Sequence, residues 1–496
     1  MVKNPCRGGE MADASALGAD GSNPMEVQVL SPAPPIVAFS RLAYARRMKR
    51  AIGSRRAVIA WVGAVVLILV SLLTYQSFRQ GYNIPVWQVD HFDHADFRYV
   101  AEIFWGEPHD LRTYQPDFSE DWGRYLDAVP FRGIGVGTYY LTLRALIGFV
   151  NPGVAADPIR LGVFIAWSMK LLLASAYAIF FGVCRRRVGT RLALLCLALL
   201  LFPWKTWILI EEMLVEPLVR ILFVLAMSVL LSIHESRGRL RLGAALFLFP
   251  FLLAAHLKAP WMFYPLLILP AIVLRLHAEK LSLRHALPAV ALTLCVPLTL
   301  LLVNVLWWQD LTLSPGAGLH AQFKTGEYTS SLCRSPTPLV TVFCNRTTKL
   351  NSWWNVYMGP DALPENYRAL DRGVLPYILH TPQRMITDAF DGLRVASNVP
   401  EGAMDILPYG ASLVILLLDI STWILLLVGL FQKETILLSA AGLGLWIIPA
   451  IGAIFALYDP RYHRPMAGIP LILAILIAVK LYGIWKKNGK QQKKSL

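Results

Sequence analysis

The sequence predicts an all-α polytopic membrane protein of about ten transmembrane helices. Hydrophobic residues make up 56% of its 496 positions and charged residues 16%, and the mean hydropathy is +0.50. These values exclude a soluble globular class. Lysine and arginine runs recur beside long apolar stretches, at 46–56, 185–191, 237–241 and 486–494. Because loops rich in lysine and arginine stay on the cytoplasmic side, these runs orient every segment of the chain.

A helix needs roughly 17 to 25 apolar residues to cross the hydrocarbon of a bilayer. Spans are expected at 57–78, 161–184, 191–210, 213–233, 242–255, 259–276, 286–306, 411–431, 435–457 and 465–485. They leave two sizeable outer loops, 79–132 and 307–409, and short basic inner loops. Function is therefore expected on the outer face.

The nearly apolar stretch 133–150 is predicted to lie in the outer interface as an amphipathic helix. If it spanned the membrane, the Arg185, Arg186 and Arg187 cluster would fall outside. An interfacial helix with Arg144 on its wet face instead puts every basic cluster inside. Both termini are then cytoplasmic, and a plasma (inner) membrane protein has its site on the periplasmic or extracellular side.

Five regions follow from this topology. Residues 1–50 are predicted to be disordered or a spurious extension, with Met48 as the expected start, because they are rich in Gly, Ala, Ser and Pro and lack an apolar core. A transmembrane module covers 57–306, a large outer loop 307–409, and further transmembrane helices 411–485. The basic tail 486–496 is expected to meet anionic lipid head groups. The net charge of +15 is thus topological, and no nucleic-acid partner is expected.

Cysteines and aromatic residues leave two alternatives open in the large outer loop. Cys333 and Cys344 both lie in it and could be bridged on an oxidising side of the membrane. Its tryptophans, among them Trp307 and Trp353, suit either stacking on sugar faces or anchoring at the bilayer interface.

The first outer loop opens with a dense acidic group. Asp90, His91, Asp93, His94 and Asp96 stand within seven residues, just past a predicted span. Carboxylates here could act as a general base, as metal ligands, or as solvated charge.

Other charges are predicted at the same face, at the ends of spans. Basic groups at this depth suit a lipid-linked phosphate, although side chains at span ends also snorkel to the interface in any membrane protein. The group comprises Lys205, Glu211, Glu212, Glu216, His256, Lys258, Asp459, Arg461, His463 and Arg464.

Lys170, Arg220 and Asp419 lie deeper, roughly 12 to 15 Å below the outer end of their spans. Charges inside hydrocarbon are costly and usually paired. Asp419 is therefore expected to neutralise Arg220 or Lys170 as a structural group, with a substrate pocket as the alternative.

The order of these features resembles the GT-C class of integral-membrane glycosyltransferases, similar to protein O-mannosyltransferases and the aminoarabinose transferases of lipid A. Asp93, Asp96 and Tyr99 occupy the place of the acidic motif of the first outer loop. Arg132 and Gly133 lead into the interfacial helix, as a basic and a small residue do in the family. The family's Asp-Glu pair is Asp-Phe here, so the identity of the base stays open between the two aspartates.

Later motifs of the class are matched in the same order. An Arg-rich cytoplasmic turn is matched at 185–191, a Glu-Pro-Leu at Glu216, the Lys-Pro turn at Lys258, and a late Arg-Tyr before a Pro-rich span at Arg461. The resemblance covers 55–485.

The resemblance implies a hexosyl- or pentosyltransferase that uses a polyprenyl-phosphate-linked sugar donor and a glycan, lipid or protein acceptor at the outer face. It implies Asp96 or Asp93 as the base and His463 as a candidate proton donor. Arg132, Lys258, Arg461 and Arg464 would clamp the phosphate, with Glu216 and Tyr99 also at the substrate. No cofactor is required, while a divalent metal stays open because of the His91, Asp93, His94 cluster.

Two rival classes remain. A transporter of lipid-linked sugars would show inverted repeats and charges at the midplane. A surface-polysaccharide polymerase or ligase would also use a large outer loop with Arg and His.

Overall fold

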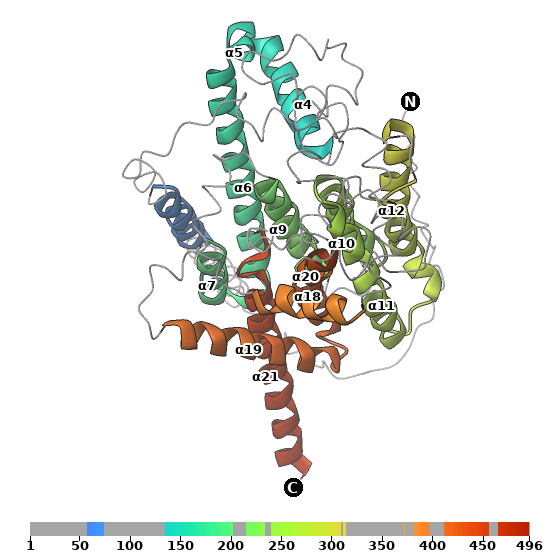
Figure 1. Ribbon diagram of the computed structural model, residues 1–496. Coiled ribbons are helices and arrows are strands. Elements are labelled where there is room, and N and C mark those ends of the chain that lie inside the picture. The colour runs from blue at the N-terminus through green and yellow to red at the C-terminus, as the bar shows by residue number, and fades with distance from the viewer. Residues whose placement is uncertain are drawn as a thin grey trace, which may run out of the picture. The chain divides into compact units, whose positions relative to one another are not determined.

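The computed structural model describes residues 57–73, 134–201, 215–233, 240–308, 311–313, 372, 379, 382–395, 411–455 and 465–495. Contacts divide the chain into Met1–Val58 and Ile59–Leu496, and the packing described below is that of the second unit. Helices and the turns between them account for the described residues, which contain no strand (Figure 1). The all-α class predicted from the sequence is confirmed for this part of the chain.

The helices follow one another with short connections wherever both neighbours are described. After an apolar helix at Ala57–Leu73 they are α4 (Ile134–Val150), α5 (Pro152–Ala156), α6 (Pro158–Val188), α7 (Thr190–Leu201), α9 (Glu216–Ile233), α10 (Leu240–Leu257), η2 (Ala259–Met262), α11 (Phe263–Ala278), η3 (Leu283–Ala286), α12 (Leu287–Trp308), α18 (Pro382–Val395), α19 (Ala411–Leu430), α20 (Ile436–Phe455) and α21 (Ile469–Ser495).

Six segments are long and apolar enough to cross a membrane, by length and composition. They are Arg160–Val188, Glu216–Ile233, Ala259–Ala278, Leu283–Leu306, Leu413–Leu430 and Ile469–Asn488. The chain is therefore a multi-pass membrane protein. The other four predicted spans coincide with shorter apolar helices, Ala57–Leu73, Thr190–Leu201, Leu242–Leu257 and Ile436–Gly452. The total of ten stays a prediction.

Two helices, α6 and α21, are longer than a simple span. α6 has 31 residues, about 46 Å at the helical rise, which exceeds the ~30 Å of hydrocarbon. It ends after Arg187, where Gly189 has a φ of 85°, the left-handed conformation that glycine adopts at a helix end. α21 continues to Ser495, so the basic tail extends a helix. α4 matches the predicted stretch 133–150 to within one residue.

The directions of the central helices follow from pairs of contacts. The Arg220 guanidinium donates to Tyr177, and the Arg187 guanidinium donates to the Ser232 carbonyl, so α6 and α9 are parallel. The Lys258 ammonium meets Glu216, while Gly243 lies against Ile233, so α9 and α10 are antiparallel. The basic end of α6 and the start of α10 therefore lie at the same end of the bundle, as the predicted topology requires.

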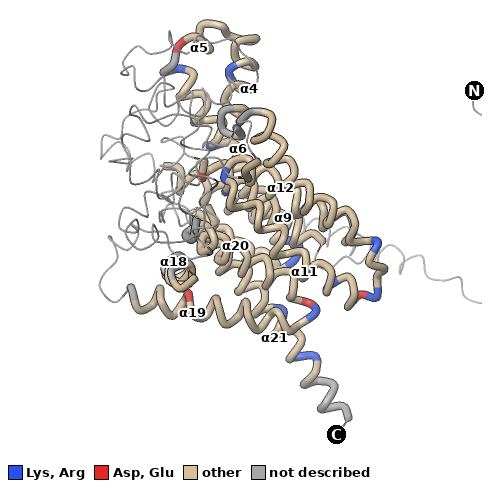
Figure 2. Tube along the Cα trace, turned by 45° about the vertical axis from the view of Figure 1, so that its right-hand side comes forward, with Lys and Arg blue, Asp and Glu red and all other residues tan. Residues whose placement is uncertain are grey.

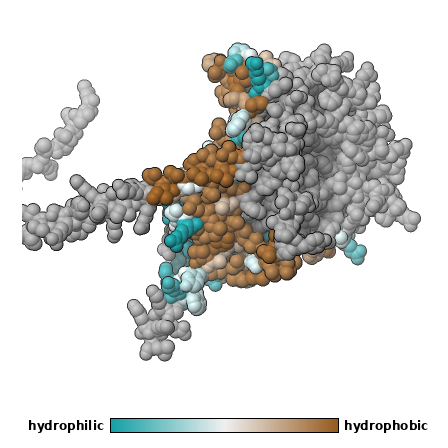
Figure 3. All heavy atoms as spheres, turned by 90° about the vertical axis from the view of Figure 1, so that its left-hand side faces the viewer, coloured by the Kyte–Doolittle hydropathy of each residue, from teal (hydrophilic) through white to brown (hydrophobic). Residues whose placement is uncertain are grey.

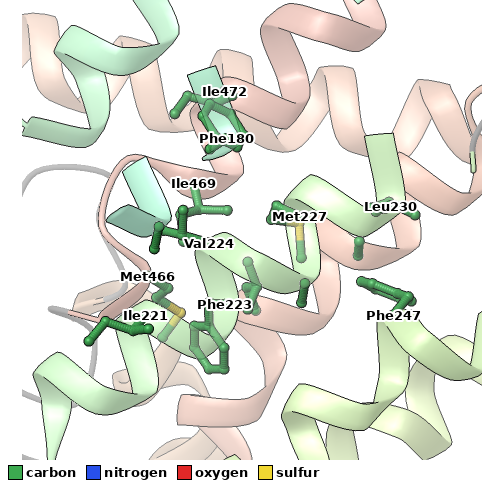
Figure 4. Close-up of a cluster of buried hydrophobic side chains, with 14 of the residues drawn as sticks. Phe180, Ile221, Phe223, Val224, Met227, Leu230, Phe247, Met466, Ile469 and Ile472 are labelled. Carbon is green, nitrogen blue, oxygen red and sulfur yellow. The ribbon is translucent and has the colours of Figure 1, made fainter. Parts of the chain in front are cut away.

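α9 is the centre of the core. Its spanning window is 72% buried, against 22% for that of α19. Figure 4 shows Phe180 of α6, Met466 and Ile469 beside α21, and Phe247 of α10 around Val224 and its neighbours on α9. An apolar helix buried on nearly all sides occupies the middle of a bundle.

The outward faces of the described helices are apolar. Leu294, Leu298 and Leu302 of α12 are exposed, as are Leu413 and Val414 of α19. Figure 3 shows apolar residues over most of the described surface on one side, and Figure 2 shows lysine and arginine gathered near helix ends. This is the distribution expected of a surface that faces lipid.

α18 lies within the predicted outer loop 307–409 and packs against α20. Met385, Ala389 and Leu393 recur every four residues and are partly buried, whereas Ile386 and Phe390 are exposed. Figure 1 also shows α19 running across α21 instead of along it. This part of the outer-loop region is therefore helical and belongs to the packed bundle.

A tight turn precedes α21. Gly468 has a φ of 80°, and a Cβ on it would lie 2.8 Å from the Leu199 carbonyl oxygen near the end of α7. Only glycine tolerates both this backbone conformation and this approach. The turn thus docks on α7.

We expect Gly468→Ala to destabilise the protein by about 1–3 kcal/mol, because alanine is strained at this φ and collides with a backbone oxygen. Thermal unfolding of the purified protein measures the effect. Gly483→Ala in α21 is the matched control: nothing lies within 4 Å of its added Cβ, and alanine in a helix should be neutral or stabilising by up to about 1 kcal/mol. Equal melting temperatures for the two variants would contradict the docking.

Candidate functional site

An ion pair joins the start of α9 to the end of α10. The Lys258 ammonium lies 2.6 Å from the Glu216 carboxylate. The carboxylate side chain is 3% exposed and the lysine side chain 25%. The Glu216 side chain is therefore almost completely buried, whereas part of the Lys258 side chain is accessible.

The local sequence places both charges. Glu216 is the first residue of α9, followed by Pro217, and proline suits the first turn because its missing N–H would have no helical partner there. Pro260 prevents α10 from continuing, and Lys258 before it is extended, with φ −149°. An anion at a helix start and a cation at a helix end both interact favourably with the helix dipoles. The antiparallel packing of α9 and α10 brings these two ends together.

An aromatic layer surrounds η2, the turn that follows Lys258. Phe223, two turns along α9 from Glu216, contacts Trp261 of η2 edge to face at 4.4 Å between ring centroids. Phe251 stacks on Phe223 at 5.3 Å and on Tyr264 at 3.8 Å. These rings pack the turn after Lys258 against α9 and α10.

One turn after Glu216, the guanidinium of Arg220 is fully buried and binds four groups. Its Nε donates to the Tyr177 hydroxyl at 2.7 Å, and its Nη2 donates to the Leu200 carbonyl at 2.7 Å. Its Nη1 donates to the carbonyls of Pro465 and Ala467, at 3.0 and 3.1 Å. The single side chain links α6, the end of α7 and the turn before α21.

The second deep cation, Lys170, lies on the same face of α6 as Tyr177, because seven residues make about two helical turns. Lys170 is buried, and its Nζ lies 4.8 Å from the centre of the Trp167 ring. The hydrogen bonds described above for Arg220 go to Tyr177 and to carbonyls. The neutralisation of Arg220 or Lys170 by Asp419 stays a prediction.

The start of α4 approaches the same place. A Cβ on Gly135 would lie 2.6 Å from the Leu257 side chain and 3.4 Å from the His256 carbonyl oxygen. Farther along α4, the Tyr139 and Ser168 hydroxyls are 2.6 Å apart. The first turn of α4 thus contacts the residues that lead into Lys258.

Of the predicted site residues, Glu216 and Lys258 are in direct contact. The first turn of α4 contacts Leu257, the residue before Lys258. The remaining predicted site residues lie outside the described residues: Asp93, Asp96, Tyr99, Arg132, Arg461, His463 and Arg464.

Metal and cysteine predictions fall mainly outside the described chain as well. The described residues contain no group of three His, Cys, Asp or Glu side chains that could hold a metal ion, and the His91, Asp93, His94 cluster lies outside them. Cys184 and Cys196 are buried free thiols, and Cys295 is an exposed one. Cys333 and Cys344 are not among the described residues.

His256 faces away from this centre. Its Nε2 lies 3.2 Å from the Thr299 hydroxyl of α12, and that hydroxyl donates to the Val296 carbonyl. The threonine proton is used there, so the imidazole must donate from Nε2. His256 thus joins α10 to α12.

Sequence reasoning missed Tyr177 and the carbonyls of Leu200, Pro465 and Ala467. The seven-residue spacing of Lys170 and Tyr177 is the one signal that could have indicated the tyrosine, because it puts two polar groups on one face of an apolar helix. The carbonyls carry no side-chain signal. Only the packing of the turn before α21 against α9 brings the carbonyls of Pro465 and Ala467 to Arg220.

No protein-family model, no curated protein and no solved structure matches the chain. Its function is therefore argued from its own residues and their geometry.

We expect Lys258→Met to destabilise the protein by about 2 kcal/mol, since a buried carboxylate loses its cation while the lysine was partly exposed. Glu216→Gln with Lys258→Met should cost less than the sum of the single changes, because the double variant leaves no uncompensated charge. Chemical denaturation of the four proteins measures the coupling.

The Arg160–Asp157 pair is the matched control, with side chains 71% and 37% exposed at 3.2 Å. Arg160→Met should change stability little, as exposed pairs do. Additive effects at Glu216 and Lys258 would contradict a coupled pair.

Proposed function

We propose that this protein is a membrane glycosyltransferase of the GT-C kind, which transfers a sugar from a polyprenyl-phosphate donor to an acceptor at the outer face of a plasma membrane. The observation that carries the proposal is the Lys258–Glu216 pair, a buried carboxylate holding a partly exposed ammonium where α4, α9 and α10 meet. A lysine fixed at a helix end near the edge of an apolar bundle suits the phosphate of a lipid carrier.

Several cations support a phosphate site in this proposal. Arg132 stands two residues before the helix that contacts Leu257, and Arg461 and Arg464 stand just before the turn that Arg220 binds. Glu216 accepts one hydrogen bond from the Lys258 ammonium and thereby fixes its position. In the proposal these basic residues share the charge of the leaving phosphate.

The proposed reaction needs one base. The acceptor hydroxyl oxygen attacks the anomeric carbon, the bond from that carbon to the phosphate oxygen breaks, and the hydroxyl proton passes to Asp96 or Asp93. Polyprenyl phosphate leaves with the electron pair, and the cations stabilise it. His463 is the candidate proton donor, and Tyr99 contacts the substrate. A divalent metal at the acidic group remains an open part of the proposal.

The proposal includes ten membrane spans with both termini in the cytoplasm. It is supported by the parallel course of α6 and α9, which puts the Arg185 cluster and the last turn of α9 at one end of the bundle. The Glu216–Lys258 pair lies at the other end. That end is the outer one if the basic runs are cytoplasmic.

We expect Asp96→Asn or Asp93→Asn, whichever removes the base, to lower sugar transfer by at least about a hundredfold, because general base catalysis contributes roughly that much. Arg461→Ala should lower it too, through weaker stabilisation of the leaving phosphate. Membranes containing each variant are supplied with a panel of radiolabelled polyprenyl-phosphate sugars, and both donor consumption and label transfer are measured.

Wild-type protein and Arg160→Met, a change at an exposed pair, serve as controls with equal expression. If no donor is consumed, or if both aspartate variants keep full activity, the proposal fails. A surface-polysaccharide polymerase or ligase, or a transporter of lipid-linked sugars, then takes its place.

The topology gives a separate prediction. In protein whose Cys333 and Cys344 are replaced by serine, a membrane-impermeant thiol reagent should label Ser314→Cys on intact cells. It should label Gln432→Cys, between α19 and α20, only after the membrane is opened, because that turn is predicted to be cytoplasmic. Labelling of Gln432→Cys on intact cells would show that α19 does not cross the membrane.

A further inference from the structure

The turn between α19 and α20 is held in place by two side chains. The buried Arg275, near the end of α11, donates to the Lys433 carbonyl. The buried Thr435 hydroxyl donates to the Gly429 carbonyl at 2.8 Å. These two bonds fix the backbone of the turn, whereas the side chain of Lys433 is 65% exposed. The lysine is therefore presented outward from a fixed position.

α21 packs directly on this turn. A Cβ on Gly429 would lie 3.1 Å from the Ile477 side chain. Lys480 follows Ile477 by three residues, which places it on the same side of α21 and about 4.5 Å farther along the helix. The side chain of Lys480 is partly buried. Lys433 and Lys480 thus come from two elements that meet, and we call the place where they meet the basic corner.

Exposed aromatic rings stand next to both lysines in the chain. Phe431, two residues before Lys433, is 86% exposed, and Trp485 of α21 is 72% exposed. The rings of Tyr482 and Trp485 lie 6.0 Å apart between centroids. Aromatic rings beside lysines are typical of the level at which a bilayer meets water. The basic corner is therefore expected at the depth of phospholipid head groups.

Positive charge prevails on this surface. Lys486 and Lys487 are exposed and continue it along α21, where the helix leaves the bundle (Figure 2). Glu434 lies 3.8 Å from the Lys433 ammonium, and its side chain is 32% exposed. As far as it is described, the surface combines four lysines with this one glutamate. It therefore attracts anions.

The basic corner has the properties of a lipid site. Basic pockets between transmembrane helices bind anionic head groups, and lysine binds a phosphate as a point charge. A site built on fixed elements also loses less conformational freedom on binding than one on a mobile chain. The turn held by Arg275 and the helix packed against it are such elements.

We propose that the basic corner binds the head group of an anionic phospholipid. The ammoniums of Lys433 and Lys480 hold its phosphate. The rings of Phe431, Tyr482 and Trp485 pack against its glycerol and the first carbons of its acyl chains. This site is independent of the proposed sugar transfer, so it can be tested without turnover.

Native mass spectrometry tests the proposal. Full-length protein is released from nanodiscs of phosphatidylcholine with increasing shares of phosphatidylglycerol, and retained lipid is counted. Wild-type protein should retain phosphatidylglycerol in preference to phosphatidylcholine. Lys433→Gln with Lys480→Gln should lower the apparent affinity for phosphatidylglycerol about tenfold or more, because each basic residue strengthens binding to an anionic head group. Equal retention of the two lipids by wild-type protein, or unchanged affinity in the glutamine variant, would overturn the proposal.

Two further variants separate a site from general attraction. Lys433→Arg with Lys480→Arg should keep most of the affinity, since arginine also binds phosphate. Lys493→Gln with Lys494→Gln is the matched control, because it removes the same charge from the same helix, about 20 Å beyond Lys480. Its affinity should stay within about twofold of the wild-type value, because salt screens charges at that distance.

The proposal is wrong if the tail variant loses as much affinity as the Lys433 and Lys480 glutamine variant, since the attraction would then be unspecific. It is also wrong if the arginine variant loses affinity as fully as the glutamine variant. Charge at these two positions would then not be what binds the lipid.

Discussion

The hydrogen bonds of one buried arginine hold the described bundle together near the end where Glu216 and Lys258 meet. Arg220 reaches Tyr177 of α6, the Leu200 carbonyl of α7 and two carbonyls before α21. The last four carbonyls of a helix lack helical partners, and so do those of a turn. The arginine satisfies such carbonyls at two places and relieves the cost of burying them.

The Lys258–Glu216 pair depends on this arrangement. Glu216 precedes Arg220 by one helical turn, so fixing Arg220 also fixes the depth and rotation of the start of α9. The pair then forms because α10 returns antiparallel and Pro260 ends it at the right level. A charged pair is acceptable in this apolar surrounding only because both charges are matched and lie at helix ends. Trp261, three residues after Lys258, packs edge to face on Phe223 of α9.

A second buried arginine anchors a turn at the opposite end of the bundle. Arg275 binds Glu279 on its own helix and the Lys433 carbonyl between α19 and α20. Buried arginines thus fasten turns at both ends, and apolar contacts fill the length between them. The difference lies in their neighbours: Arg275 carries its own acidic partner four residues away, whereas Arg220 adjoins segments that contain several predicted site residues.

The sequence by itself determined the class of the protein. Long apolar stretches must bury their backbone polar groups in helices when lipid surrounds them, and the 133–150 stretch and six of the predicted spans were located from composition alone. The sequence also singled out Glu216 and Lys258, because charges at span ends stand out against apolar neighbours. The sequence could not show that these two residues form an ion pair. They are 42 residues apart, and only the antiparallel packing of α9 and α10 brings them together. The partners of Arg220 were decided by tertiary structure for a stronger reason: three are backbone carbonyls, which every residue has, so no side chain in the sequence marks them.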